Sequence, residues 1–160
     1  MDIKENIPTP EATTPERELS ENGVYASITR GVSMRPLFKT HRDVIIVRTP
    51  TRPLKKYDVV LYKVGDKYVL HRIIGKKDGV FIIRGDNTYT REYVEEGKIL
   101  ALLTEFNRGG KRHSVEETSF KIYSRVWNFI YPVRYLLQFF RRAVRKVFRV
   151  VFKKKKRTET

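Results

Sequence analysis

Ser33 is the residue of this chain whose setting first suggests chemistry. It lies in Thr29–Phe38, two residues after Gly31 and three before Pro36, with Met34 directly behind it. Glycine permits a left-handed turn or a close backbone approach, and proline fixes φ and has no N–H to donate. Such a segment predicts a strand end or sharp turn that presents the serine hydroxyl at a rim. Taken alone, however, a serine in this setting is more often an ordinary turn residue.

A serine hydroxyl becomes a nucleophile beside a base, and the base in turn needs an orienting group. Two later segments contain such groups: His71 lies in the apolar run 68–75, and Asp86 lies in 85–87, Gly-Asp-Asn. With an ordinary pKa of about 6.5, histidine accepts a proton near neutral pH, whereas lysine would need strong desolvation. The alternatives are a half-buried histidine bonded to backbone and a turn aspartate that bonds its own loop.

The order of these segments resembles that of the signal peptidase and LexA-type serine peptidases, also called S24/S26-like peptidases. The similarity covers roughly residues 24–103 and rests on Ser33-Met34-Arg35-Pro36, the run around His71, the strand 57–62 and Gly85-Asp86-Asn87. It implies that Ser33 is the nucleophile. It also implies that His71 is the base, at the position where bacterial signal peptidases usually carry lysine.

The remaining parts of such a site are less well defined by the sequence. Asp86 is preferred as the third member of the triad, but Glu92 lies where some histidine-type relatives place the orienting carboxylate, and the choice stays open. The resemblance implies that the backbone N–H of Ser33 and one neighbour form the oxyanion hole. Gly31, Met34 and Pro36 complete the serine box, although many signal peptidases have a hydroxyl residue in place of Gly31.

The composition argues against several other kinds of site. The chain of 160 residues has no cysteine, which excludes thiol catalysis, disulfides and cysteine-ligated zinc. Its histidines, His41, His71 and His113, lie far apart and lack the spacing of metal ligands. Neither a phosphate-binding Gly-x-x-x-x-Gly-Lys loop nor a dinucleotide fingerprint occurs. We therefore expect no metal and no cofactor.

The charge divides the chain into three segments. Residues 1–22 carry two Lys and Arg against six Asp and Glu, residues 23–118 carry nineteen against eleven, and residues 119–160 carry thirteen against one. The first segment has three prolines and few large apolar residues, so we expect a flexible lead-in. It has neither the basic start and apolar core of a signal peptide nor the membrane anchor that typical signal peptidases carry before the serine.

The middle segment, residues 23–118, is predicted to be the peptidase domain and to consist mainly of β structure. Apolar runs at 43–47, 57–63, 67–74 and 80–83 are separated by turn residues such as Asp78-Gly79. Helical spacing of apolar residues is absent from this segment. Many short strands with frequent turns indicate a small, coiled antiparallel β barrel or sandwich.

The last segment, residues 119–160, is predicted to be a basic amphipathic helical tail. Apolar residues recur every three or four positions with Arg and Lys between them, and Pro132 starts a second helix or kinks the first. No apolar run approaches the roughly twenty residues of a transmembrane helix. We expect peripheral association with an anionic membrane at its cytoplasmic face. The residues expected at that surface are Trp127, Phe140, Arg141, Arg142, Arg145, Lys146, Phe148, Arg149, Lys153, Lys154, Lys155 and Lys156.

Two hypotheses of function follow from these features. The first is a serine endopeptidase whose substrate, a preprotein, leader peptide or regulatory protein, binds as an extended strand beside an exposed sheet edge. The resemblance implies that the enzyme cleaves after small residues. Its substrate could also be its own chain, as in LexA-type proteins. The second is a catalytically inactive basic module that binds an anionic membrane or nucleic acid through its tail. The tail's aromatic residues lie on one helical stripe, which favours a bilayer over nucleic acid.

Overall fold

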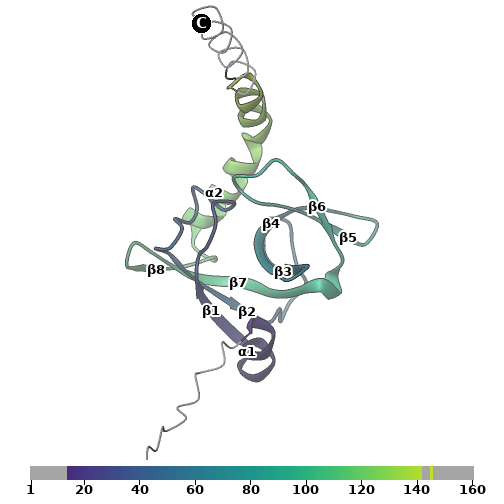
Figure 1. The fold of residues 1–160 in the computed structure, drawn as a ribbon, viewed down its shortest axis with the longest axis vertical. Coiled ribbons are helices and arrows are strands. Elements are labelled where there is room, and N and C mark those ends of the chain that lie inside the picture. The colour runs from purple at the N-terminus through teal and green to yellow at the C-terminus, as the bar shows by residue number, and fades with distance from the viewer. Residues whose placement is uncertain (1–13, 142–144, 146–160) are drawn as a thin grey trace, which may run out of the picture. The chain divides into compact units, whose positions relative to one another are not determined.

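The computed structural model describes residues 14–141 and 145 (Figure 1). The chain divides into two units, Met1–Lys121 and Ile122–Thr160, and each is described by itself. Among the described residues, the strands all belong to the first unit and the second unit is helical.

Eight strands form a single antiparallel sheet within the described part of the chain. Their order is β1-β2-β7-β3-β4-β5-β6, with β8 paired to β7. The strands are β1 (Val24–Ile28), β2 (Val44–Arg48), β3 (Val59–Val64), β4 (Lys67–Lys77), β5 (Val80–Arg84), β6 (Glu92–Val94), β7 (Ile99–Arg108) and β8 (Lys111–Ser114). Figure 1 shows that the sheet is strongly curved. The predicted mainly β fold is therefore confirmed.

The strands form where β-branched and aromatic residues are concentrated, and the turns between them follow from local chemistry. The β4–β5 hairpin turns at Asp78 and Gly79, whose φ angles of 49° and 80° are those of a type I′ turn. The β3–β4 hairpin pairs Val64 with Lys67 at its turn and Val59 with Arg72 at its far end. This hairpin register places Lys67–Arg72 of β4 opposite the six residues of β3.

Residues 15–22 differ from the sequence expectation of a flexible lead-in, because they form helix α1 (Pro15–Asn22). The Thr14 side chain accepts a hydrogen bond from the Arg17 N–H, and proline stands at the first helical position. Leu19 is buried, and the helix ends at Gly23 in the left-handed region. These caps, together with the buried Pro15 and Leu19, order a segment whose composition alone suggested disorder.

The core of the first unit is built from residues of five strands, β3 to β7. Its buried cluster consists of Val60, Tyr62, Ile73, Phe81, Ile83, Val94, Ile99 and Leu102. Each large apolar side chain buried in this way contributes about 1.5–3 kcal/mol to stability. The strands that carry the functional residues are thus held by a packed core.

The second unit continues helix α2 (Thr118–Phe129), which is followed by a helical stretch at residues 131–141. Pro132 lies at the start of that stretch, as predicted. Over the described ranges 14–141 and 145, no helix is long and apolar enough to cross a membrane. Several residues expected at the membrane surface lie outside the described part: Arg142, Lys146, Phe148, Arg149, Lys153, Lys154, Lys155 and Lys156.

Candidate active site

The Ser33 box forms a compact turn after β1 that is fastened to the Gly-Asp-Asn loop. Within the box, the Arg35 N–H donates to the Val32 carbonyl at 3.2 Å. From the loop, the Asn87 backbone N–H donates to the Ser33 carbonyl at 2.7 Å, and the Asn87 side chain donates to Val32 at 3.2 Å. Two segments far apart in sequence are therefore joined at the serine itself.

Gly85 lies where the Ser33 backbone and the His71 ring meet. A Cβ atom at this position would lie 2.8 Å from the Ser33 carbonyl oxygen and 2.9 Å from Nε2 of His71. Both distances are shorter than any normal carbon contact, so the site has room only for glycine. Nε2 of His71 therefore lies close to the backbone of the serine turn. The pairing of the Ser33 hydroxyl with His71 stays a prediction.

The opposite ring nitrogen of His71 faces a carboxylate and a hydroxyl. Its Nδ1 atom lies 3.1 Å from Oε1 of Glu92 and 3.1 Å from the hydroxyl of Tyr62. That hydroxyl also donates to Oε2 of Glu92 at 2.5 Å. Tyr62 and His71 belong to the paired strands β3 and β4, whereas Glu92 reaches the site from β6.

The histidine is poised in its neutral form. It is 6% exposed, and burial lowers its pKa below the ordinary value of 6.5, although the Glu92 carboxylate opposes this by favouring the imidazolium. Burial outweighs the attraction of the Glu92 and Asp86 carboxylates, so the contact between His71 and Glu92 is a hydrogen bond of neutral imidazole near pH 7. The carboxylate is in place to stabilise a positive charge when the ring takes up a proton.

Asp86, the sequence-preferred third member, binds a different partner. Its two oxygens accept from Nε and Nη2 of Arg72, each at 2.8 Å, in a bidentate pair that is almost fully buried. The guanidinium also donates to the Tyr57 carbonyl at 3.0 Å and stacks on the Phe120 ring. The expectation of a direct contact between Asp86 and His71 is not met, and Glu92 occupies the place beside the imidazole.

Ser33 and His71 both line a cavity of about 830 Å³. Most of its lining residues come from β1 and the residues after it and from the first half of β4, with a few from β2, β3 and β6. Within the described residues, β1 pairs only with β2, and β4 pairs with β5 only from Arg72 onward. β1 and the first half of β4 both line this cavity, and each has one edge that no strand of the described residues covers, as the binding of an extended peptide requires.

The serine turn also leaves hydrogen-bond donors available. Over residues 14–141, neither the backbone N–H of Ser33 nor that of Met34 donates a hydrogen bond, and the Ser33 hydroxyl is likewise unbonded. Gly31 has a φ of 79°, and its carbonyl accepts from the Thr40 hydroxyl. Met34 is buried beneath the turn, and Pro36 lies exposed beyond it. Such free N–H groups beside a nucleophile are what an oxyanion hole needs.

Among the described residues, no group of three or more His, Asp or Glu side chains is arranged to hold a metal ion.

The family described as Peptidase S24-like matches residues 2–104, more than half of the chain, and spans Ser33, His71, Asp86 and Glu92. The chain belongs to this family. No match was found among curated proteins. The S24-like match covers the whole of β1 to β6, so the strands that carry the candidate site are those of a peptidase family.

Tyr62 is the residue of this S24-like site that the sequence interpretation missed. A tyrosine in a buried strand is ordinarily a core residue, and Tyr62 is indeed fully buried. A signal was nevertheless present, because the Gly65-Asp66 turn fixes a register that pairs Tyr62 with Val69. Residues diagonally opposite in a hairpin are neighbours on one face, which places Tyr62 beside His71.

Proposed function

We propose that this S24-like peptidase is a serine endopeptidase in which Ser33 is the nucleophile, His71 the general base and Glu92 the orienting carboxylate. The observation that carries the proposal is the position of the His71 ring. Its Nδ1 atom lies 3.1 Å from Glu92, while its Nε2 atom faces the Ser33 turn across Gly85. A base held between a carboxylate and a serine is the arrangement of a serine hydrolase.

In the proposed reaction, the neutral His71 ring accepts the Ser33 proton at Nε2 as the serine oxygen attacks the peptide carbonyl. Glu92 stabilises the imidazolium that forms, and the imidazolium then protonates the leaving amine. Water activated by the same ring hydrolyses the acyl-enzyme and restores Ser33. The backbone N–H groups of Ser33 and Met34 would stabilise the oxyanion, and each donor in such a hole contributes about 3 kcal/mol.

The substrate would be a polypeptide segment in extended form, from a preprotein, a leader peptide or a regulatory protein. It would lie between the free edges of β1 and of Lys67–Leu70 and form backbone hydrogen bonds with one or both. This interpretation is supported by the cavity, because residues of both strand segments line it together with Ser33 and His71. A strand bound in this slot would carry its scissile bond to the serine.

The tail would hold the enzyme at an anionic membrane surface. Along residues 131–141, Val133, Leu136, Leu137 and Phe140 recur at helical spacing and are 55–62% exposed. Arg134, Gln138 and Arg141 lie on a different stripe of the same helix. An exposed apolar stripe beside basic residues suits the interface of an anionic bilayer.

The proposal is tested by mapping cleavages in a peptide library, with anionic liposomes present, by mass spectrometry. Wild type is expected to cleave peptides at defined positions, while Ser33→Ala and His71→Ala leave them intact. Ser119→Ala, at an exposed serine outside the site, is the control and retains cleavage. Full cleavage by either site variant would refute the proposed roles. Membrane binding without any cleavage would favour the alternative of an inactive basic module.

A further inference from the structure

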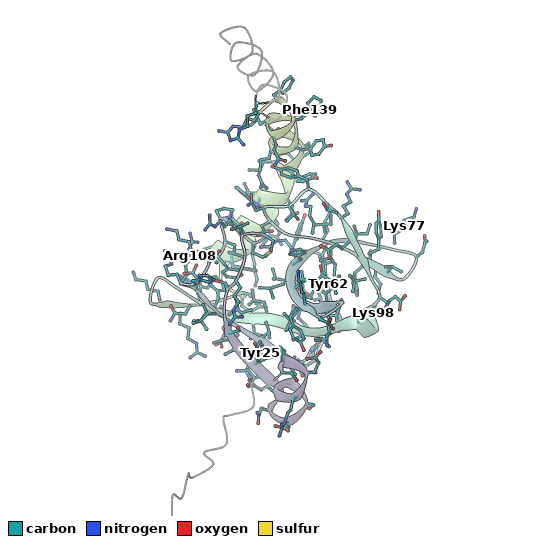
Figure 2. All side chains as sticks on the ribbon, viewed as in Figure 1. Tyr25, Tyr62, Lys77, Lys98, Arg108 and Phe139 are labelled. Carbon is teal, nitrogen blue, oxygen red and sulfur yellow. The ribbon has the colours of Figure 1, made fainter. Side chains whose placement is uncertain are left out.

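Tyr62 is placed to control the geometry of the site without touching a substrate. Figure 2 labels it on β3, the strand that pairs with β4 on one side and β7 on the other. The side chain is fully buried, and it is not among the residues that line the cavity. Any part it has in the reaction must therefore pass through the groups that its hydroxyl contacts.

The hydrogen bonds of that hydroxyl fix where the protons lie. At 2.5 Å, the contact with Oε2 of Glu92 is the shorter of the two, and an ionised carboxylate only accepts, so the phenol hydrogen points to Glu92. The phenol oxygen is then left to accept from Nδ1 of His71 at 3.1 Å. Burial and the bond to Glu92 raise the pKa of Tyr62 above its ordinary value of 10.0, so the phenol keeps its hydrogen.

Nδ1 of His71 therefore faces two acceptors, the Tyr62 oxygen and Oε1 of Glu92, each at 3.1 Å. An imidazole with acceptors at Nδ1 keeps its hydrogen there and leaves Nε2 bare. The bare nitrogen is the one beside the Ser33 turn. This is the tautomer that a general base for Ser33 requires.

Glu92 needs such a tether because of where it lies. It belongs to β6, a strand of three residues that pairs only with β5 in the described part of the sheet, and its side chain is 31% exposed. A carboxylate on a short edge strand has solvent as a competing partner. Tyr62 projects from a central strand and has no exposed surface, so its hydroxyl offers a fixed partner to the Glu92 carboxylate.

We propose that Tyr62 is a positioning residue, which holds the Glu92 carboxylate against His71 and keeps the hydrogen of the imidazole on Nδ1. The effect of Tyr62 on catalysis rests on the proposed function. The tautomer of the His71 ring, in contrast, is a property of the resting protein and can be measured without any reaction. The two claims therefore have separate readouts.

The first readout is nitrogen-15 NMR of the histidine rings at neutral pH, with His71 assigned by comparison with His71→Gln. Wild type is expected to hold His71 with hydrogen on Nδ1 and a bare Nε2. In Tyr62→Phe, which keeps the ring and removes only the oxygen, a measurable fraction shifts to the other tautomer. A wild-type ring with bare Nδ1 overturns the proposal whether or not the variant folds.

The second readout is the rate at which a fluorophosphonate probe labels Ser33. Tyr62→Phe is expected to slow labelling about tenfold, the scale of one lost hydrogen bond. Because Tyr62 acts through Glu92, the same change in a Glu92→Gln background should slow it less than twofold further. Tyr93→Phe, on β6 and 66% exposed, is the matched control and leaves the rate unchanged.

The outcomes separate the two claims. The positioning role is overturned if wild type and Tyr62→Phe are labelled at the same rate. It is also overturned if Tyr62→Phe slows labelling in the Glu92→Gln background by the same factor as in wild type. Either result leaves the peptidase proposal standing. A tautomer shift in Tyr62→Phe, in a protein whose wild type is never labelled, supports the positioning role and refutes the peptidase proposal.

Discussion

The carboxylate of Glu92 lies 3.1 Å from Nδ1 of His71, although the two residues come from β6 and β4, which are separated in the sheet by β5. This contact defines the site more than the Gly-Asp-Asn sequence does. The loop that carries Asp86 has a different task, since it holds the Ser33 turn through Asn87 and the histidine strand through Arg72.

Glu92→Gln should damage the chemistry and spare the fold. An amide at this position cannot stabilise the imidazolium by charge, and it can present its NH₂ group to Nδ1 and favour the wrong tautomer. We expect fluorophosphonate labelling to slow by on the order of 10²–10⁴-fold. Urea unfolding should change little, because the side chain is 31% exposed. A labelling rate within twofold of wild type would contradict the role of Glu92.

Asp86→Asn should instead destabilise the fold. It leaves the guanidinium of Arg72, which is fully buried, without its counter-charge, and breaking such a buried pair costs about 3–5 kcal/mol. The measurement is the free energy of unfolding in urea. Glu95→Gln is the control, because it removes the charge from an ion pair, Glu95 with Lys98, in which both side chains are exposed. Exposed pairs contribute at most about 1 kcal/mol to stability. If Asp86→Asn abolished labelling at unchanged stability, Asp86 would be the orienting residue after all.

Gly85→Ala should separate the serine from its base. The new methyl group would collide with the Ser33 carbonyl and the His71 ring, and neither is a flexible chain end. We expect labelling of Ser33 to fall by more than tenfold, as displacements near 1 Å typically do in active sites. Gly97→Ala is the matched control, since a methyl group there meets nothing within 4 Å. Unchanged labelling in Gly85→Ala would contradict the described packing of Ser33 against His71.

The labelling rate should rise with pH and reach half of its plateau below pH 6.5. Burial lowers the pKa of His71 below that ordinary value, and only the neutral ring acts as a base. The unfolded chain then binds this proton more tightly than the folded one. The contribution of His71 to stability is therefore complete above pH 6.5 and is lost as the pH falls through the pKa of the folded state. A midpoint above pH 6.5 would mean that the attraction of Glu92 outweighs burial.

Arg141→Glu should weaken binding to anionic vesicles. The residue lies at the end of the described helical stretch 131–141, next to the apolar stripe. Each basic residue near such a surface contributes about 1 kcal/mol, so reversing one charge should lower the partition coefficient by roughly tenfold or more. Flotation with anionic and with neutral vesicles measures this. Lys98→Glu makes the same charge change at an exposed position of the first unit and should have little effect on vesicle binding. An equal loss of binding in both variants would mean that net charge alone, and not the tail, determines binding.

Much of the fold could be predicted because its signals are local. The runs around β2, β3 and β5 are rich in β-branched residues, and Asp78-Gly79 fixes a hairpin. Ser33 and His71 could be singled out because each lies in a short, ordered pattern, and their roles stay predictions. The choice between Asp86 and Glu92 depended on how β6 folds back on β5, which is a long-range pairing that local spacing does not encode. Helix α1 was missed because its caps, Thr14 and Gly23, outweigh its polar composition.

The most direct test of the account is fluorophosphonate labelling of wild type and Ser33→Ala at pH 7.5 or above, about one unit above the ordinary pKa of histidine, followed by mass spectrometric mapping of the modified residue. The account predicts a single adduct on Ser33 in wild type and none in Ser33→Ala. Absence of any adduct in a folded wild type, or equal labelling of both proteins, would contradict it.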